Sequence, residues 1–179
     1  MLRIAILVLT LAFSACDKPA KSVPTQSTSD AGIDSLFNIQ QGNKLTYLKI
    51  AGTDLEKSRG LMGVAKLPAD TGMVFLYEAD QVMRFWMKDT PIDLDIAFIQ
   101  ADGVIAEIKT MKAEDTTEVA SQSSHIRFCI EMSAGWYASS QVKVGDRINI
   151  DQLKQALVAR GFNVHRYFYV TSERAPNRQ

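Results

Sequence analysis

The sequence predicts a single mainly β domain, an antiparallel sandwich or barrel-like fold with a few short helices. Apolar and polar residues alternate with period two along most of the chain, which is the spacing of a half-buried strand. Turn residues separate these segments at intervals of roughly 8–15 residues. Asp102–Gly103 joins two segments directly, and this leaves no helix of the kind that a doubly wound sheet places between successive strands.

The first predicted elements are a strand and a short helix. Residues 44–51 (KLTYLKIA) alternate and predict the strand. Thr53 and Glu56 then form a capping box, in which each side chain can bond the backbone N–H of the other residue. The helix that follows is expected to end near Gly60 or Gly63.

Four strands are predicted in the middle of the chain. Residues 72–78 (GMVFLYE) predict a buried strand, and residues 82–88 (VMRFWMK) predict the next. Pro91 has no backbone N–H to donate, so the ladder is expected to break there. Residues 94–100 and 104–111 flank the Asp–Gly turn and predict a hairpin.

The last third predicts further strands and one helix. Residues 125–132 (HIRFCIEM) and 145–150 (GDRINI) predict two strands. Asp151 is positioned to cap a helix that Gly161 would stop. Residues 162–170 (FNVHRYFYV) alternate again and predict a strand that closes the sheet.

The N-terminus is typical of a bacterial lipoprotein signal. Arg3 precedes a ten-residue apolar region, Ile4–Phe13, which is too short to span a bilayer but suits a secretory signal. The following FSAC resembles a lipobox, whose cysteine, here Cys16, carries lipid and becomes the mature N-terminus. An ordinary cleaved signal is the alternative. We expect the protein on the periplasmic side of the cell envelope, and Asp17 favours the inner membrane.

The chain divides into four predicted parts. Residues 1–15 are the signal peptide, and residues 16–35, rich in Pro, Ser, Thr and Lys, are a disordered tether. Residues 36–170 form the β domain, and residues 171–179 form a polar, flexible tail.

Composition argues against several classes of function. Twenty basic residues balance twenty acidic ones and the pI is about 6.7, so we expect no nucleic-acid partner. Cys129 has no cysteine left to pair with if Cys16 is lipidated, which predicts a buried thiol. His125 and His165 have no metal-ligand spacing with it, so we expect no metal site and no cofactor.

Residues from about 46 to 150 resemble the DUF192 family, a bacterial and archaeal domain of uncharacterised function. The resemblance rests on six blocks in order: RGLMG, GMVFLY, FWMKDTPIDLDIAFI, DG, IEMSAG and VGD. It implies a mainly β fold, often in a secreted protein, and it implies no reaction. The matching residues are Arg59, Gly60, Leu61, Met62, Gly72, Met73, Trp86, Met87, Lys88, Thr90, Leu94, Asp95, Glu131, Gly135, Gly145 and Asp146.

Three of the predicted strands carry a polar face. Because side chains alternate along a strand, Trp86 and Lys88 share a face opposite Met83, Phe85 and Met87, which face the core. If the strands are neighbours, we expect Lys88, Asp95 and Glu131 to converge beside Trp86. The candidate ligand-binding residues are Arg59, Trp86, Lys88, Thr90, Asp93, Asp95 and Glu131.

Three hypotheses for the function follow. The first is a non-enzymatic, membrane-anchored module that binds a small polar ligand, a glycan or an envelope protein. The second is a hydrolytic enzyme with Asp95 or Glu131 as base and Lys88 as electrostatic stabiliser. The third is a structural envelope protein, in which the charges occupy the solvent face of a sheet and Lys88 and Asp95 form a weak surface pair.

Overall fold

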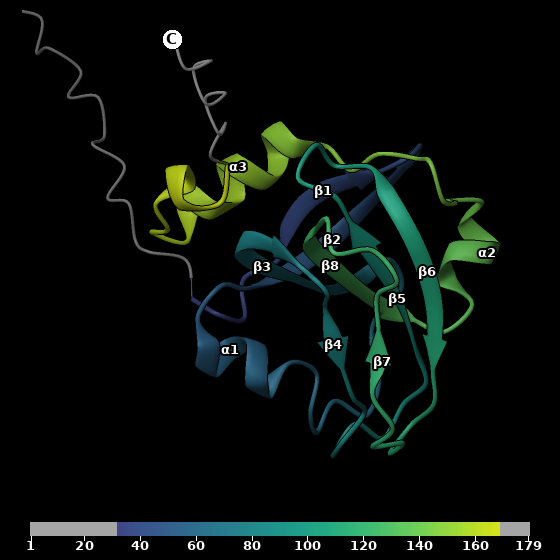
Figure 1. Cartoon of the computed structure of the whole chain (residues 1–179). Helices are drawn as coiled ribbons and strands as arrows, with labels where there is room; N and C mark the ends of the chain where they lie inside the picture. Colours follow the sequence, from purple (N-terminus) through teal and green to yellow (C-terminus); the bar gives the residue numbers. More distant parts are fainter. Residues whose placement is uncertain (1–31, 169–179) are drawn as a thin grey trace, which may run out of the picture.

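The computed structural model describes residues 32–168, in which the largest element is a mixed sheet of six strands (Figure 1). The mainly β class predicted from the sequence is confirmed. The strands, in their order across the sheet, are β1 (Phe37–Gln41), β2 (Lys44–Ala51), β3 (Thr71–Gln81), β8 (Ile126–Ser133), β5 (Leu94–Ile99) and β6 (Ile105–Met111). β4 (Arg84–Phe85) and β7 (Val119–Ala120) pair separately as a small second sheet.

The sheet is not purely antiparallel, because β2 and β3 run parallel. A parallel connection needs a crossover, and here it contains helix α1 (Asp54–Arg59). Thr53 and Glu56 form the capping box that the sequence predicts, and Gly60 follows the last turn. The capping box thus fixes where α1 begins, next to the end of β2.

The two faces of the sheet pack into two apolar clusters. The inner cluster contains Ile50, Ile130 and Leu153 among others, and α2 (Trp136–Ser140) and α3 (Ile150–Ala159) contribute to it. The outer cluster contains Phe75, Ile96 and Cys129, with Leu61 from the segment after α1. The buried Cys129 thiol agrees with its expected place in the core.

Two predicted strands are replaced by other structures in the described residues. In 162–168 the chain forms the 3-10 helix η1 (Val164–Arg166), so the predicted strand is wrong there. The Asn163 side chain caps this turn, and the carbonyl of Tyr167 accepts a bond from Arg127. The alternation of residues 162–168 therefore reflects rings that pack onto the core, such as Phe168 against Phe128.

Residues 146–149 form a strap rather than the predicted strand. The strap makes two isolated bridges, Gln41 with Ile148 and Val104 with Arg147, so it bonds to both β1 and the start of β6. It links the two edges of the sheet at one end only, and no closed barrel forms among the described strands. The strap ends at Asn149, which caps α3 in place of the predicted Asp151.

The predicted strand at 82–88 is short. Arg84 and Phe85 alone pair with β7, while Met83 and Met87 are buried as predicted. In residues 32–168 no helix has the length and apolar character to cross a bilayer. The predicted signal peptide, Cys16, Asp17, most of the tether and the tail lie outside the described residues.

Candidate functional site

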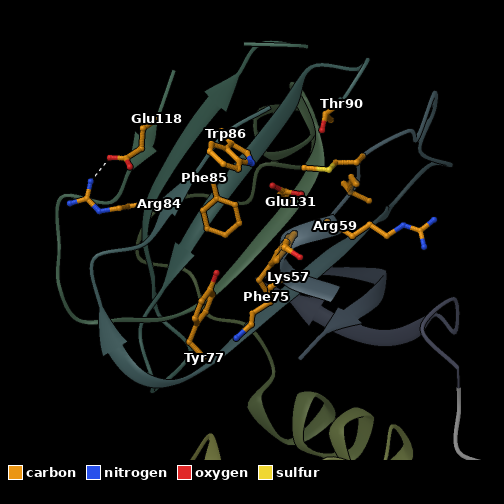
Figure 2. A pocket seen from close by; sticks show the side chains of 14 residues that line it. Lys57, Arg59, Phe75, Tyr77, Arg84, Phe85, Trp86, Thr90, Glu118 and Glu131 are labelled. Atoms are coloured by element: carbon orange, nitrogen blue, oxygen red, sulfur yellow. Dashed lines mark hydrogen bonds and ion pairs between the residues drawn. The ribbon is translucent and has the colours of Figure 1, made fainter. Parts of the chain in front are cut away.

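A pocket of about 330 Å³ opens on the outer face of the sheet, between α1 with its following loop, β3 and β4 (Figure 2). Four of the predicted ligand-binding residues line it: Arg59, Trp86, Thr90 and Glu131. Its volume is at the lower end of the range for small-molecule sites. The pocket thus brings together residues from α1, the β4 segment and β8 that are far apart in the sequence.

Four aromatic side chains, here called the aromatic wall, surround the pocket: Phe75, Tyr77, Phe85 and Trp86. Phe75 and Tyr77 share a face of β3, and the ring of Phe85 meets that of Phe75 edge to face with centroids 5.1 Å apart. Trp86 is 59% exposed, so it forms part of the rim. The wall offers a ligand a large apolar and π surface.

Glu131 supplies a buried carboxyl group inside the pocket. It lies on β8, only 4% of the residue is exposed, and its carboxyl points toward Trp86 and Phe85 (Figure 2). Within residues 32–168 this carboxyl has no hydrogen bond or ion pair to another group. Burial therefore raises the pKa of Glu131 to about 8, because the ionised form loses its hydration.

Gly72 explains how β3 passes so close to Glu131. A Cβ atom at Gly72 would lie 2.1 Å from the backbone oxygen of Glu131. Any side chain at position 72 would therefore push β3 away from β8. This glycine keeps the strand that carries Phe75 and Tyr77 close to the strand that carries the carboxyl group.

The cations at the rim of the pocket form no ion pair with Glu131 in the described part of the chain. Arg84 forms an ion pair with Glu118, and its guanidinium points away from the interior, as does that of Arg59 (Figure 2). Lys57 is paired with Asp54 at 3.0 Å, and its ammonium lies 4.6 Å from the centre of the Tyr77 ring.

Asp95 does not join the pocket, contrary to the expected convergence of Lys88, Asp95 and Glu131. In the pairing of β5 with β8, Ile96 lies opposite Glu131, so Asp95 points to the other face of the sheet. There it is buried and accepts hydrogen bonds from Thr110 Oγ1 and the Gly135 N–H, each at 2.8 Å. These bonds tie β5 to β6 and to the start of α2.

Asp93 and Lys88 also lie outside the pocket lining. Asp93 accepts a bond from the Ala113 N–H at 2.8 Å and pairs with Lys112 at 2.7 Å. These contacts lower the pKa of Asp93, with the bond from Lys112 as the largest cause. Lys88 is exposed in the loop after β4.

Thr90, in contrast, is buried at the edge of the pocket and is held by backbone bonds. Its N–H donates to the Met87 carbonyl, and its carbonyl accepts from the Glu114 N–H. Its hydroxyl donates to the Lys88 carbonyl at 3.2 Å. These bonds fix the loop around Pro91, so Thr90 can support the pocket as well as line it.

Phe75, Tyr77 and Phe85 were not among the residues predicted to bind a ligand. Phe75 and Tyr77 alternate on one side of GMVFLYE, which the sequence identifies only as a buried strand. Phe85 was assigned to the core, and it does pack against Phe75 and Phe98. The shared face of Phe75 and Tyr77 was the available signal, but it cannot tell a filled core from a pocket.

We expect the Lys88→Ala variant to retain full stability. Lys88 is exposed and lies outside the pocket lining, so its loss should change the free energy of unfolding by less than about 0.5 kcal/mol. Urea unfolding of the two proteins measures this. A Lys109→Ala variant is the matched control. The Lys109 ammonium donates to the Ala120 carbonyl, so this substitution should lower the free energy of unfolding by more. A large loss for Lys88→Ala would contradict the peripheral place of this residue.

The described residues contain no group of three His, Cys, Asp or Glu side chains arranged to hold a metal ion. What the pocket offers is one carboxyl group of raised pKa, an aromatic wall and polar groups at the rim. This arrangement suits a small ligand with an apolar body and one polar or charged group.

Comparison with known proteins gives the fold and the family. A crystal structure from Sinorhizobium meliloti 1021, named "putative transcription regulator", is similar with a TM-score of 0.62 and 23% identity, over 64% of this chain and 93% of that one. A protein of unknown function from Novosphingobium aromaticivorans has a TM-score of 0.60 and 25% identity, over 64% and 84% of the two chains.

No curated protein has a significant match to the sequence. The DUF192 family model, described as "Uncharacterized ACR", matches residues 37–150, which include β1 to β8, α2 and every residue of the pocket lining. The chain therefore belongs to the DUF192 family.

Proposed function

We propose that this protein is a non-enzymatic binding module of the cell envelope, lipid-anchored and facing the periplasm, that takes a small polar ligand into the pocket above Glu131. One observation carries the proposal: a buried carboxyl group without a partner in residues 32–168 faces an open pocket. Burial raises the free energy of the ionised form of this group, because that form loses hydration. A ligand that bonds to it would recover that cost.

Binding is favoured over hydrolysis by the positions of the candidate catalytic residues. A hydrolase that uses Lys88 as stabiliser needs this side chain beside the base, and Lys88 lies outside the pocket lining. Asp95 faces the other side of the sheet, where its oxygens are occupied by Thr110 and Gly135. Glu131 alone of the three lines the pocket, and one carboxyl group beside an aromatic wall suits recognition of a ligand.

The ligand site can be tested with methionine methyl groups. We expect a screen of small envelope metabolites, against the full chain in maltoside micelles, to yield ligands that shift the ¹³C-methyl signal of Met62, which lines the pocket. Met132, in the inner cluster, is the control within the same molecule. If no compound gives a saturable shift of the Met62 signal, the proposed binding function is wrong.

The membrane location rests on the sequence of the N-terminus. The FSAC block resembles a lipobox, and the following polar segment is long enough to hold the domain away from the bilayer. Cys129 is fully buried, so it does not compete for the lipid. These features support an anchor at Cys16, and Asp17 supports the inner membrane.

We expect the Cys16→Ser variant to take up no lipid. Bacterial cells grown with radiolabelled palmitate should label the wild-type protein, because acyl chains are attached at the lipobox cysteine. The Cys129→Ala variant is the matched control, since it removes the other cysteine and should remain labelled. Label on Cys16→Ser, or none on the wild-type protein, would show that the anchor is misassigned.

A further inference from the structure

The Glu131 carboxyl faces the interior of the pocket, and the ammonium of Lys57, which also lines it, is paired with Asp54. The guanidinium of Arg84 is engaged by Glu118, and the guanidinium of Arg59 points outward (Figure 2). An anionic ligand would therefore meet the buried carboxyl before it met a free cation. Once the Glu131 carboxyl is ionised, this distribution disfavours an anion inside the pocket and favours a cation.

We propose that the ligand is an organic ammonium cation, held by the Glu131 carboxylate as counter-ion and by the aromatic wall. This inference rests on the proposed function, because it names the ligand class of the same pocket. Cations are attracted to the faces of aromatic rings, most strongly where water is excluded. The ammonium of Lys57, 4.6 Å from the Tyr77 ring centre, shows that one ring of this wall already attracts a cation.

The apolar part of the wall favours a methylated ammonium group over a primary amine. Phe75 and Phe85 carry no hydrogen-bond acceptor, so an N–H directed at either ring would lose a bond to water without replacement. Methyl groups remove such donors and pack against the rings, while the positive charge remains. The Glu131 carboxylate then balances that charge without having to satisfy several donors.

Binding of a cation should be linked to release of a proton from Glu131. The pKa of this carboxyl is raised to about 8 by burial, so most molecules hold the proton at pH 7. A cation pairs with the ionised form, so the proton of Glu131 passes to the solvent as the ligand enters. Affinity should therefore rise about tenfold per pH unit up to about pH 8 and be constant above it.

Other titratable groups around the pocket do not follow this profile. Burial raises the pKa of Tyr77 and of Cys129, so both stay neutral where Glu131 titrates. The charged groups on the surrounding elements are Lys57 and Arg59 of α1, Arg84 of β4 and Glu118 next to β7. The raised pKa of Glu131 comes from burial, and these surrounding charges have little influence on that pKa.

Three probes of the same shape and different charge test the inference. Choline is the cation, 3,3-dimethyl-1-butanol replaces its nitrogen by carbon, and 3,3-dimethylbutanoate carries a negative charge. Each is titrated into the full chain in maltoside micelles from pH 6 to pH 9, with the Met62 methyl signal as readout. We expect choline to bind at least tenfold more tightly than the alcohol at pH 8.5, and the anion to bind most weakly.

Variants separate the role of the charge from that of the rings. Glu131→Gln should lower the affinity for choline at least tenfold and abolish the pH dependence of choline binding. The affinity for the alcohol should stay unchanged. Trp86→Leu removes an aromatic ring at the exposed rim, and it should lower the affinity for choline more than the affinity for the alcohol. Asp151→Asn removes an equal charge from the exposed side of α3 and is the matched control, with unchanged binding.

The outcomes distinguish the ligand class from the function itself. If the alcohol or the anion binds as tightly as choline, the pocket is a binding site but its ligand is not a cation. If choline binds equally well to Glu131→Gln, the carboxyl is not its counter-ion, and the inference is overturned. If none of the probes binds, the cation inference fails, and the metabolite screen alone decides whether the pocket binds ligands.

Discussion

In the Glu131→Gln variant, the free energy of unfolding should lose most of its dependence on pH between about pH 4.5 and pH 8. The folded-state pKa of Glu131 is about 8, above the ordinary value of 4.5 that holds in the unfolded chain. Between these values the folded protein keeps a proton that the unfolded chain releases. The contribution of Glu131 to stability is therefore fully present below about pH 4.5 and is lost progressively as the pH rises to 8.

The expected size is a few kcal/mol, because each unit of pKa difference corresponds to about 1.4 kcal/mol. At pH 8.5 the glutamine variant should be more stable than the wild-type protein by an amount of this order. Urea unfolding of both proteins at pH 5, 6.5 and 8.5 measures the difference, with Asp151→Asn as control. Parallel pH profiles for wild type and Glu131→Gln would show that the carboxyl ionises normally in the folded protein.

We expect Asp95→Ala to have the largest effect on stability at neutral pH, a loss of about 2–4 kcal/mol. The substitution removes two buried hydrogen bonds and leaves the Gly135 N–H and the Thr110 hydroxyl without their acceptor. Gly135 is the N-cap residue of α2, so the lost bond lies at the turn that begins this helix. Chemical unfolding with an unchanged m-value measures the loss.

Two comparisons make the Asp95 result specific. Asp93→Ala is the matched control, since the Asp93 side chain is 39% exposed and its partners can turn to water, so its loss should be clearly smaller. Binding of pocket ligands by folded Asp95→Ala should be unchanged, because Asp95 faces the other side of the sheet. Loss of binding in the folded variant would instead connect Asp95 to the site.

Local features of the fold were predictable because they depend on neighbours in sequence. The capping box of Thr53 and Glu56 begins α1, and the Asp102–Gly103 turn joins β5 to β6. The strand predicted at 162–170 fails over the described residues because alternation also arises when rings pack onto a core from an irregular segment. The parallel pairing of β2 with β3 depends on contacts that no local pattern contains.

The site was predictable residue by residue but not in its geometry. Side chains alternate along β5, so Asp95 and Ile96 point to opposite faces, Asp95 beside Met132 and Ile96 beside Glu131. The register between β5 and β8 decides which of the two shares a face with Glu131. A shift of one residue would place Asp95, instead of Ile96, beside Glu131. The aromatic wall likewise combines side chains of β3 with side chains of β4 and the residue after it. These two strands belong to different sheets, and only tertiary packing brings them together.

The strap at residues 146–149 has a consequence for how copies of this protein meet. Its Asn149 N–H donates to the Gln40 carbonyl, and its Ile148 N–H donates to the Gly103 carbonyl, so backbone groups at both edges of the sheet are occupied. Unpaired edge strands are templates on which chains aggregate. For a protein that we propose is anchored to a membrane, the strap leaves fewer unpaired backbone groups at which two copies can join edge to edge.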